Sequence, residues 1–241
     1  MTDPPVQLPP GLALAWGVLP VQRRGPKPAF TVDQIVATGI EFGDSQGFEA
    51  ISLQKIAARL GVSTNALYRY VSSKDELIVL VAEKAWGRAP AHISAAPDWR
   101  SGGRAWVKAQ VDRYADRPWL LEVPIRGAPA TPNLLHWLET LLEVMADTGL
   151  SQHDALGCAL LFDGYARSYA SLARQLGASD SAPVESAAVG EFLVPRLQAA
   201  GYDRIFAMYT NQEYEDTLDD DFDFGLDRIL DGIQVLIDRQ E

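Results

Sequence analysis

The chain has 241 residues, of which 47% are hydrophobic, and its formal net charge is −11. This hydrophobic share excludes disorder along the whole length, and the chain is long enough for one sizeable core and a smaller one. The single cysteine, Cys158, cannot form a disulfide within the chain, which favours a reducing compartment such as the cytoplasm. The simplest interpretation of Cys158 is a small buried hydrophobe.

Residues 1–29 form a Pro-rich leader that we predict to be flexible, with Trp16 available to dock on the folded part of the chain. The apolar stretch within residues 9–20 is bracketed by prolines, and no basic residue precedes it, so it is not a signal peptide. No other stretch approaches eighteen uninterrupted apolar residues. We therefore predict a cytoplasmic protein with no membrane partner.

Charge is unevenly divided along the chain. Residues 1–90 carry nine Lys and Arg against eight Asp and Glu, whereas residues 91–241 carry twelve against twenty-four. Within the front part, the twenty-five residues from Ala50 to Lys74 contain no acidic residue. A basic front joined to an acidic body is expected if only the front touches a polyanion. The alternative is that the acidic run at residues 213–224 alone makes the body acidic.

Four helices are predicted in the front part from their N-terminal signals. Thr31 and Gln34 have capping-box spacing, so a first helix begins near residue 32 and ends before the breaker Gly47. Ser52 can cap a second helix and Ser63 a third, very short one. Ser73 and Glu76 form another capping-box pair, which opens a fourth helix running toward Trp86.

The second and third helices have the pattern of a helix-turn-helix. Ala57 allows close approach of the helices, Gly61 can adopt the left-handed conformation of the turn, and Leu67 pins the second helix to the first. The outward face of the short helix carries hydrogen-bonding side chains that are long enough to reach base edges and phosphates. These are Thr64, Asn65, Tyr68 and Arg69. A solvated face would normally mix both charge signs, so the pattern favours DNA binding.

These residues resemble the DNA-binding domain of TetR-family transcriptional regulators, from the first helix through LYRYVSSKDEL. The resemblance implies that a basic arm, the recognition helix and the starts of two neighbouring helices contact DNA. Carried over residue by residue, the implied contacts are Arg23, Arg24, Lys27, Ser52, Gln54, Thr64, Asn65, Ala66, Tyr68, Arg69, Tyr70 and Lys74.

Alternatives remain for three of these residues. Tyr68 and Tyr70 are two apart on a helix and cannot share a face, so we expect Tyr70 to be partly packed and Tyr68 to face phosphate. For Lys74 the alternative is an ordinary surface lysine.

The rest of the chain is predicted to be helical, giving an all-α protein. Helices are expected over residues 99–117, 131–148, 151–176, 184–200 and 220–239, with a short piece opened by Pro118. This part is similar to the ligand-binding domain of the tetracycline-repressor subgroup. We therefore divide the chain into the leader at 1–29, a helix-turn-helix domain at 30–75, and a ligand-binding and dimerisation domain at 76–241.

Homodimerisation is expected through the helices at 151–176 and 220–239. Gly157 and Gly164 are seven apart on the first of these helices, and Gly225 and Gly232 on the second. Small residues at this spacing allow close helix packing, although packing within one chain explains each helix equally well. The family resemblance implies a four-helix dimer interface here, and a two-fold dimer doubles the contacts of one short recognition helix.

An effector pocket is predicted between the helices from aromatic residues with a few polar partners. Core packing is the competing interpretation for each of them. The positions that align with the tetracycline repressor's magnesium-binding and drug-binding histidines carry Pro124 and Pro90, so we predict no magnesium–tetracycline recognition. We also predict no metal site and no cofactor. The candidate pocket residues are Trp106, Gln110, Trp119, Asn133, Trp137, Phe162, Tyr165 and Tyr169.

The resemblance implies a repressor that a small-molecule effector releases from its operator by moving the fourth helix. A sensor or scaffold of the same fold without operator binding is the alternative. We predict no enzymatic activity, since Cys158 and His153 are five apart on one helix and diverge in direction. Asp163 and Arg167 have the spacing of an ordinary helical ion pair.

Overall fold

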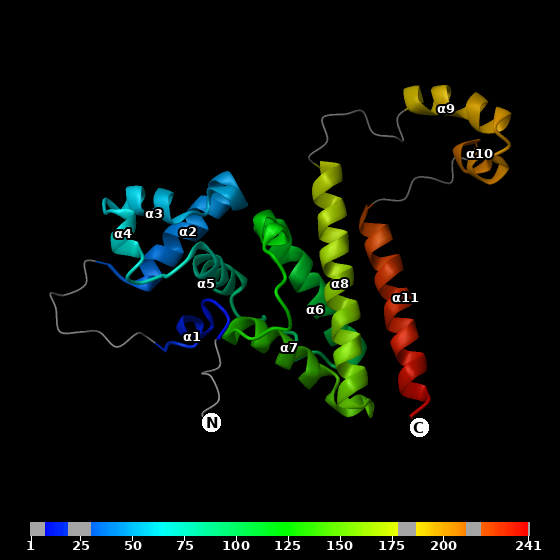
Figure 1. Cartoon of the computed structure of the whole chain (residues 1–241). Coiled ribbons are helices and arrows are strands. Elements are labelled where there is room, and N and C mark those ends of the chain that lie inside the picture. Colours follow the sequence, from blue (N-terminus) through cyan, green and yellow to red (C-terminus); the bar gives the residue numbers. More distant parts are fainter. Residues whose placement is uncertain (1–7, 19–29, 178–186, 211–217, 241) are drawn as a thin grey trace, which may run out of the picture.

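The structure is a computed structural model and describes residues 8–18, 30–177, 187–210 and 218–240. Every regular element in these ranges is a helix, which confirms the all-α prediction. Figure 1 shows a small helical head, residues 30–86, beside a larger helical body, residues 87–240. In the body, α8 and α11 run side by side, and the α9–α10 pair lies beyond the end of α8 (Figure 1).

The head contains α2 (Val32–Gln46), the 3-10 helix η1 (Phe48–Ala50), α3 (Leu53–Leu60), α4 (Thr64–Leu67) and α5 (Lys74–Trp86). The capping box is present at α2, where Thr31 Oγ1 accepts from Gln34 N at 3.2 Å and Gln34 Oε1 accepts from Thr31 N at 2.8 Å. Such caps contribute about 1 kcal/mol each. They fix where the helices of the head begin.

The other predicted caps of the head are also present. Ser52, Ser63 and Ser73 each accept a hydrogen bond from the backbone N–H three residues later. The Ser73 pair differs from the prediction in one respect, because the Glu76 carboxylate accepts from Ser72 Oγ at 2.7 Å rather than from Ser73 N. The start of α5 is therefore held by two serines.

The turn of the helix-turn-helix follows the predicted chemistry. Gly61 has φ 68° and ψ 30°, the left-handed conformation that glycine adopts without strain. Val62 N donates to Ala57 O at 3.0 Å, which closes the end of α3 in a Schellman motif. Ala57 and Leu67 are both buried at the contact between α3 and α4. These three residues set the direction of α4.

α5 belongs to the core of the head as well as to the body. Its side chains Leu77, Val81 and Ala85 pack in one cluster with Ile35 of α2 and Ile56 of α3. The boundary expected at residue 75 therefore separates residues that pack together. α5 ends at Trp86, whose side chain packs against the cores of both the head and the body.

Part of the expected leader is packed on the protein. Residues 12–15 form a helical turn, α1 (Leu12–Ala15), and Leu14 and Ala15 pack against the core of the head. Trp16 Nε1 donates to Ala130 O at 2.9 Å, so this indole does dock on the folded part. For residues 8–18 the structure thus differs from the expectation of a flexible leader, because α1 gains contacts with α5.

The body begins with α6 (Trp99–Asp116), the 3-10 helix η2 (Pro118–Glu122) and α7 (Pro132–Val144). The predicted continuation of α7 to residue 148 is a separate 3-10 helix, η3 (Ala146–Thr148). The long helix α8 (Gln152–Gly177) and the last helix α11 (Leu218–Asp238) agree with the prediction within two residues at each end.

Between these two helices lie α9 (Ala187–Ala199) and α10 (Asp203–Thr210), and the sequence analysis missed α10. The expected start of α9 at residue 184 lies outside the described residues. Gly201, with φ 73°, separates the two helices.

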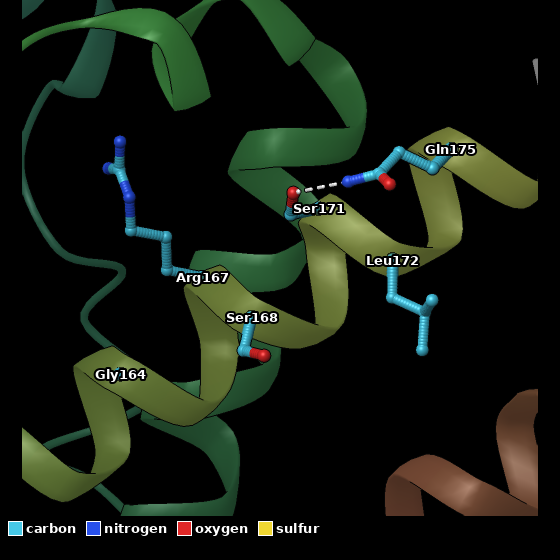
Figure 2. A pocket seen from close by; sticks show the side chains of 6 residues that line it. All are labelled: Gly164, Arg167, Ser168, Ser171, Leu172 and Gln175. Carbon is cyan, nitrogen blue, oxygen red and sulfur yellow. Dashed lines mark hydrogen bonds between the residues drawn. The ribbon is translucent and has the colours of Figure 1, made fainter.

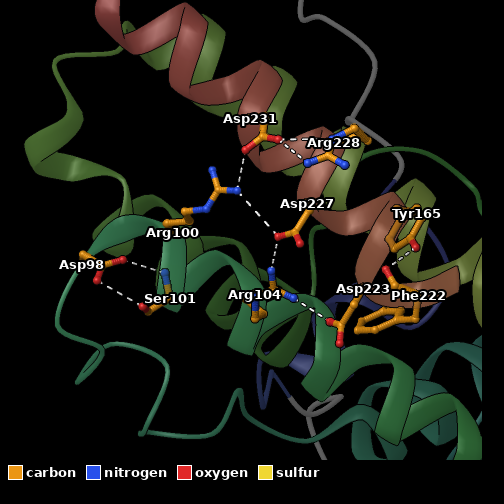
Figure 3. Close-up of polar contacts among 10 residues, drawn as sticks. All are labelled: Asp98, Arg100, Ser101, Arg104, Tyr165, Phe222, Asp223, Asp227, Arg228 and Asp231. Atoms are coloured by element: carbon orange, nitrogen blue, oxygen red, sulfur yellow. Dashed lines mark hydrogen bonds and ion pairs between the residues drawn. The ribbon is translucent and has the colours of Figure 1, made fainter. Parts of the chain in front are cut away.

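The core of the body joins α6, α7, α8 and α11. Phe162 of α8 and Leu226 and Leu230 of α11 are fully buried, and they meet Trp106 of α6 in one cluster. Outside this core, Arg100 and Arg104 of α6 extend toward α11 and meet a row of aspartates, as Figure 3 shows. The pairs include Arg100 with Asp231 at 2.6 Å, Arg104 with Asp223 at 2.6 Å, and Arg104 with Asp227.

Head and body meet at a seam formed by α2 and η2. Trp119 Nε1 donates to Asp44 Oδ1 at 2.8 Å, and Arg117 Nε lies 3.3 Å from the same carboxylate oxygen. The indole lies flat against Gly43, where a Cβ would stand 2.7 Å from the ring. Glycine at residue 43 is therefore required for this contact.

Candidate DNA-binding surface and effector site

The outward face of α4 carries side chains that are free to contact another molecule. Asn65, Tyr68 and Arg69 are exposed, and Thr64 is partly exposed. None of these four side chains has a hydrogen bond or ion pair within the described part of the chain. Tyr70 is partly buried and its ring lies 4.6 Å from that of Phe30, which confirms that Tyr70 is the packed tyrosine.

The remaining predicted DNA contacts surround α4. Gln54 and Lys74 are exposed at the starts of α3 and α5, whereas Ser52 is partly exposed and its hydroxyl is used as the cap of α3. Ala66 is partly buried on α4. The predicted basic arm, Arg23, Arg24 and Lys27, lies outside the described residues.

Two acidic groups near this surface are paired with cations. Asp75, directly after the acid-free run, lies 2.8 Å from Arg126 of the body. Glu41 of α2 lies 3.7 Å from Arg59 of α3. These pairs reduce the repulsion that a free carboxylate would exert on a phosphate backbone. The surface can therefore accept a polyanion.

The structure brings five of the predicted effector residues together. Trp106 and Gln110 of α6 and Trp137 of α7 are buried, and Trp106 Nε1 donates to Trp137 O at 2.8 Å. The rings of Trp106 and Phe162 have centroids 6.4 Å apart. Asn133 lies one turn before Trp137 on α7, where its Nδ2 donates to Glu83 O of α5 at 2.9 Å.

Two of the predicted residues lie elsewhere, between α8 and the start of α11. Tyr165 and Tyr169 stack with ring centroids 6.4 Å apart, and Phe222 of α11 packs on both of them. Tyr165 OH donates to Phe222 O at 2.7 Å (Figure 3). Trp119 is separated from both groups, because it belongs to the seam with the head.

Sequence reasoning missed three residues of the first group. Trp86 of α5 makes edge contacts with Tyr114 of α6 at 5.1 Å and with Trp137 at 5.7 Å between ring centroids. Glu83 lies one turn earlier on α5 and accepts from Asn133 N at 2.6 Å. A glutamate on the buried face of an amphipathic helix was the available signal.

Burial changes the titration of two groups in this part of the body. Burial raises the pKa of the Tyr114 phenol, which the nearby Arg167 partly offsets. Burial also raises the pKa of Asp163 on α8, and Arg167 again opposes the shift. Arg167 Nη1 donates to Tyr114 OH at 3.3 Å, and its Nη2 donates to Leu121 O of η2. Arg167 thus joins α8 to the end of α6.

The outer face of α8 carries an open groove of about 470 Å³, lined by Gly164, Arg167, Ser168, Ser171, Leu172 and Gln175. Figure 2 shows Arg167 and Leu172 pointing to different sides of α8, with Gln175 Nε2 donating to Ser171 Oγ at 3.1 Å. The groove is lined by small and polar residues and one leucine, and it lies apart from the aromatic group. Leu160 and Leu161, one turn before Gly164, are exposed on the same helix.

The residues considered for catalysis do not form a catalytic arrangement. Cys158 is buried. Burial raises the pKa of its thiol, and the negative charge of Asp154 raises it further. His153 is exposed at the start of α8. Asp163 and Arg167 serve the packing of α8 on α6 described above.

The fold and the exposed face of α4 define a helix-turn-helix regulator with an all-helical body. Residues 30–81 match the family described as "Bacterial regulatory proteins, tetR family". Residues 95–237 match the family described as "Tetracyclin repressor-like, C-terminal domain". The chain belongs to the TetR family of transcriptional regulators, with the tetracycline-repressor-like C-terminal domain.

Known relatives agree with this assignment. The HTH-type transcriptional repressor DrrR1 of Streptomyces coeruleorubidus is 33% identical over 239 residues, covering 94% of this chain and 85% of that protein. The structure of apo ActR from Streptomyces coelicolor has a TM-score of 0.68 at 20% identity, covering 91% of this chain and all of that one. ActR in complex with (S)-DNPA has a TM-score of 0.66 at 21% identity, covering 86% and 98%. At this identity the structures establish the shared fold.

Two further observations concern the described residues only. They include no helix with the length and apolar character that crossing a bilayer requires. They also include no cluster of three or more His, Cys, Asp or Glu side chains with the arrangement of metal ligands.

Proposed function

We propose that the protein is a homodimeric transcriptional repressor that binds operator DNA through α4 and is released by a small-molecule effector. The observation that carries this proposal is the exposed, unpaired face of α4 within an acid-free run of sequence. In this proposal Arg69 and Asn65 contact bases or phosphates in the major groove, and Tyr68 contacts the flanking phosphates. Such a repressor acts in the cytoplasm, where bacterial DNA is located.

The proposed DNA surface includes every contact predicted from the sequence. Thr64, Ala66 and Tyr70 complete α4, and Ser52, Gln54 and Lys74 add contacts from the neighbouring helix starts. Arg23, Arg24 and Lys27 of the arm precede α2 by a few residues in the sequence, and their positive charge favours contact with phosphates.

Dimerisation is proposed through α8 and α11. In a single chain, a Cβ added at Gly157, Gly164 or Gly232 meets nothing within 4 Å. Large apolar side chains are exposed on the same two helices, including Leu160 and Leu161 of α8 and Phe224 and Val235 of α11. Monomers rarely expose contiguous apolar surface of this kind, so a second copy is the proposed cover.

Effector release is proposed to act through α5. The aromatic group between α5, α6 and α7 lies at the C-terminal end of α5, and α4 lies beside its N-terminal end. A ligand that binds more tightly to the arrangement with α5 displaced would change the spacing of the two recognition helices. A relative in fold, ActR, is known in complex with (S)-DNPA, which supports a ligand site in a body of this shape.

The proposal is tested by fluorescence-anisotropy titration of labelled DNA from the protein's own promoter region. We expect Arg69→Ala to weaken binding about 30-fold or more, because each of two protomers loses a contact of about 1–3 kcal/mol. Lys84→Ala, an exposed basic position on α5 away from α4, is the matched control and should bind as the wild type does. Equal affinities for the wild type and Arg69→Ala would contradict the assigned surface.

A second outcome of the same titration concerns the alternative function. A sensor or scaffold without operator binding would bind the promoter segment and a scrambled duplex equally weakly, and modest salt would abolish both.

A further inference from the structure

Five aromatic rings form a continuous row through the body. The ring centroids of Tyr114 and Trp86 are 5.1 Å apart, those of Trp86 and Trp137 5.7 Å, and those of Trp137 and Trp106 6.0 Å. Phe162 of α8 continues the row beyond Trp106 at 6.4 Å. Four of the rings are buried, and Trp86 is the only one that is partly exposed. Trp86 is therefore where the row reaches solvent.

Three buried oxygen atoms near this row have no hydrogen-bond partner. Glu83 is 8% exposed, Gln110 3% and Thr131 7%. The unpartnered atoms are Glu83 Oε2, Gln110 Oε1 and Thr131 Oγ1. Leaving a buried polar atom unpaired is unfavourable, and for a carboxylate the cost is larger. All three atoms can accept a hydrogen bond.

The positions of these residues along their helices place them beside the rings. Glu83 and Trp86 are three residues apart on α5, so they share a face. Gln110 is four residues from both Trp106 and Tyr114 on α6. Thr131 directly precedes α7, whose Asn133 N donates to Glu83 Oε1 at 2.6 Å. Glu83 thus caps the start of α7 with one oxygen and leaves the other unpaired.

The charge of Glu83 is not balanced within the described part of the chain. No Lys, Arg or His nitrogen there lies within 4.0 Å of its carboxylate. Arg113 on the neighbouring helix α6 has a buried Nε without a hydrogen-bond partner. Arg113 makes no ion pair with Glu83. A buried carboxylate beside aromatic rings is the combination that recognises an organic cation, through a charge-assisted hydrogen bond and cation–π contacts.

We propose that the effector is an aromatic compound carrying a protonated amine, which donates to Glu83 Oε2 while its ring packs on Trp86 and Trp137. Gln110 and Thr131 offer two further acceptors to N–H or O–H groups of the same ligand. This inference rests on the proposed function, since it names the chemical class that the effector site takes. An anionic aromatic compound is excluded by the unpaired carboxylate.

Entry of such a ligand must separate α5 from α7. Trp137 Nε1 donates to Gly87 O at 3.0 Å, and Asn133 Nδ2 donates to Glu83 O at 2.9 Å. Both bonds hold the C-terminal end of α5 to α7. The ligand therefore competes for the contacts that fix the position of α5.

The test is a fluorescence titration of the full chain with proflavine, a planar aromatic cation, and with 9-anthracenecarboxylate, an anionic compound of similar ring size. We expect saturable proflavine binding that quenches tryptophan emission, and a loss of affinity of about ten-fold or more in Glu83→Gln. Glu139→Gln removes the same charge from an exposed position on α7 and should leave proflavine affinity unchanged. 9-Anthracenecarboxylate should bind weakly to the wild type and more tightly to Glu83→Gln.

Absence of saturable proflavine binding to the wild type, or equal affinities in the wild type and Glu83→Gln, would overturn the inference. Glutamine keeps an oxygen that can cap α7, and a thermal unfolding curve like that of the wild type would show that the variant is folded. Titration of the promoter DNA without proflavine separates the two proposals. Wild-type DNA binding with Glu83-independent proflavine binding refutes the ligand class alone, whereas Glu83-dependent proflavine binding without DNA binding refutes the proposed function alone.

Discussion

The head and the α8–α11 pair bury their apolar residues in different ways. In the head, Ile56, Leu67 and Val71 are fully buried within one chain. On α8, Leu160 is 74% exposed, and on α11 Phe224 is 66% exposed. The head therefore buries its apolar residues within the chain, partly against Trp119 and Leu120 of the body, whereas large apolar side chains of α8 and α11 remain exposed. Under the proposed function, each head contacts DNA, and the dimer sets the spacing of the two recognition helices.

The largest effect is expected from a substitution that prevents a second copy from packing on the exposed α8–α11 face. Leu160→Arg places a charge at the centre of the proposed interface, where burying it without a partner is strongly unfavourable. We expect sedimentation velocity to show monomers at micromolar concentration, with operator affinity about 100-fold lower because the second head is no longer held near the first. The head should keep its fold, since its core contains none of these residues.

Ile125→Arg is the control for this change, because Ile125 is an exposed apolar residue in the segment between η2 and α7. It should remain a dimer. A Leu160→Arg protein that is also a dimer would assign the exposed leucines of α8 to some other role.

An intermediate effect is expected at the seam between the two regions. Gly43→Ala places a Cβ 2.7 Å from the Trp119 ring, and overpacking of this kind lowers the free energy of unfolding by about 1–3 kcal/mol. Gly190→Ala is a matched change within α9, where a Cβ meets nothing within 4 Å. It should raise the free energy of unfolding by about 0.5–1 kcal/mol through helix propensity. Urea titrations of both variants check these opposite signs, and an equal response would show that the seam is loosely packed.

The smallest effect is expected from a partly buried carboxyl group in the body. Burial raises the pKa of Asp163 above its ordinary value of 3.8, although Arg167 opposes the shift. A raised pKa means that the folded state favours the protonated form, so stability is greatest below the ordinary pKa and falls as pH rises through the folded one. Asp163→Asn should therefore raise the melting temperature at pH 7, and the gain should shrink toward pH 4.

The exposed Asp116 on α6 supplies the control, because Asp116→Asn should change the melting temperature little at either pH. A lower melting temperature for Asp163→Asn at pH 7 would mean that the attraction to Arg167 outweighs the cost of burial.

The same contrast explains how far the sequence alone predicted the structure. Helix starts in the head were predicted because caps are local: Ser52, Ser63 and Ser73 each bind a backbone N–H three residues away. The helix-turn-helix followed from Ala57, Gly61 and Leu67 for the same reason. α1 was missed because four residues have no helical stability of their own and are held by α5.

The residues of the effector site were predicted less well. A sequence pattern that indicates a buried aromatic ring does not indicate which other rings it contacts. Trp119 and Tyr165 have the pattern of core residues, as Trp106 does, yet the fold places them in three separate contacts. Glu83 was missed because the sequence gives no sign that its helix lies against the start of α7. Long-range packing therefore decides the chemistry of this site.

We propose above that two heads on one dimer bind one DNA segment. The most direct test of this proposal is a stoichiometric titration of the promoter segment with the full chain, at DNA concentrations well above the dissociation constant. We expect a break at two protomers per segment and no comparable binding to a scrambled duplex. A break at one protomer per segment, or equal binding to both duplexes, would contradict the proposal.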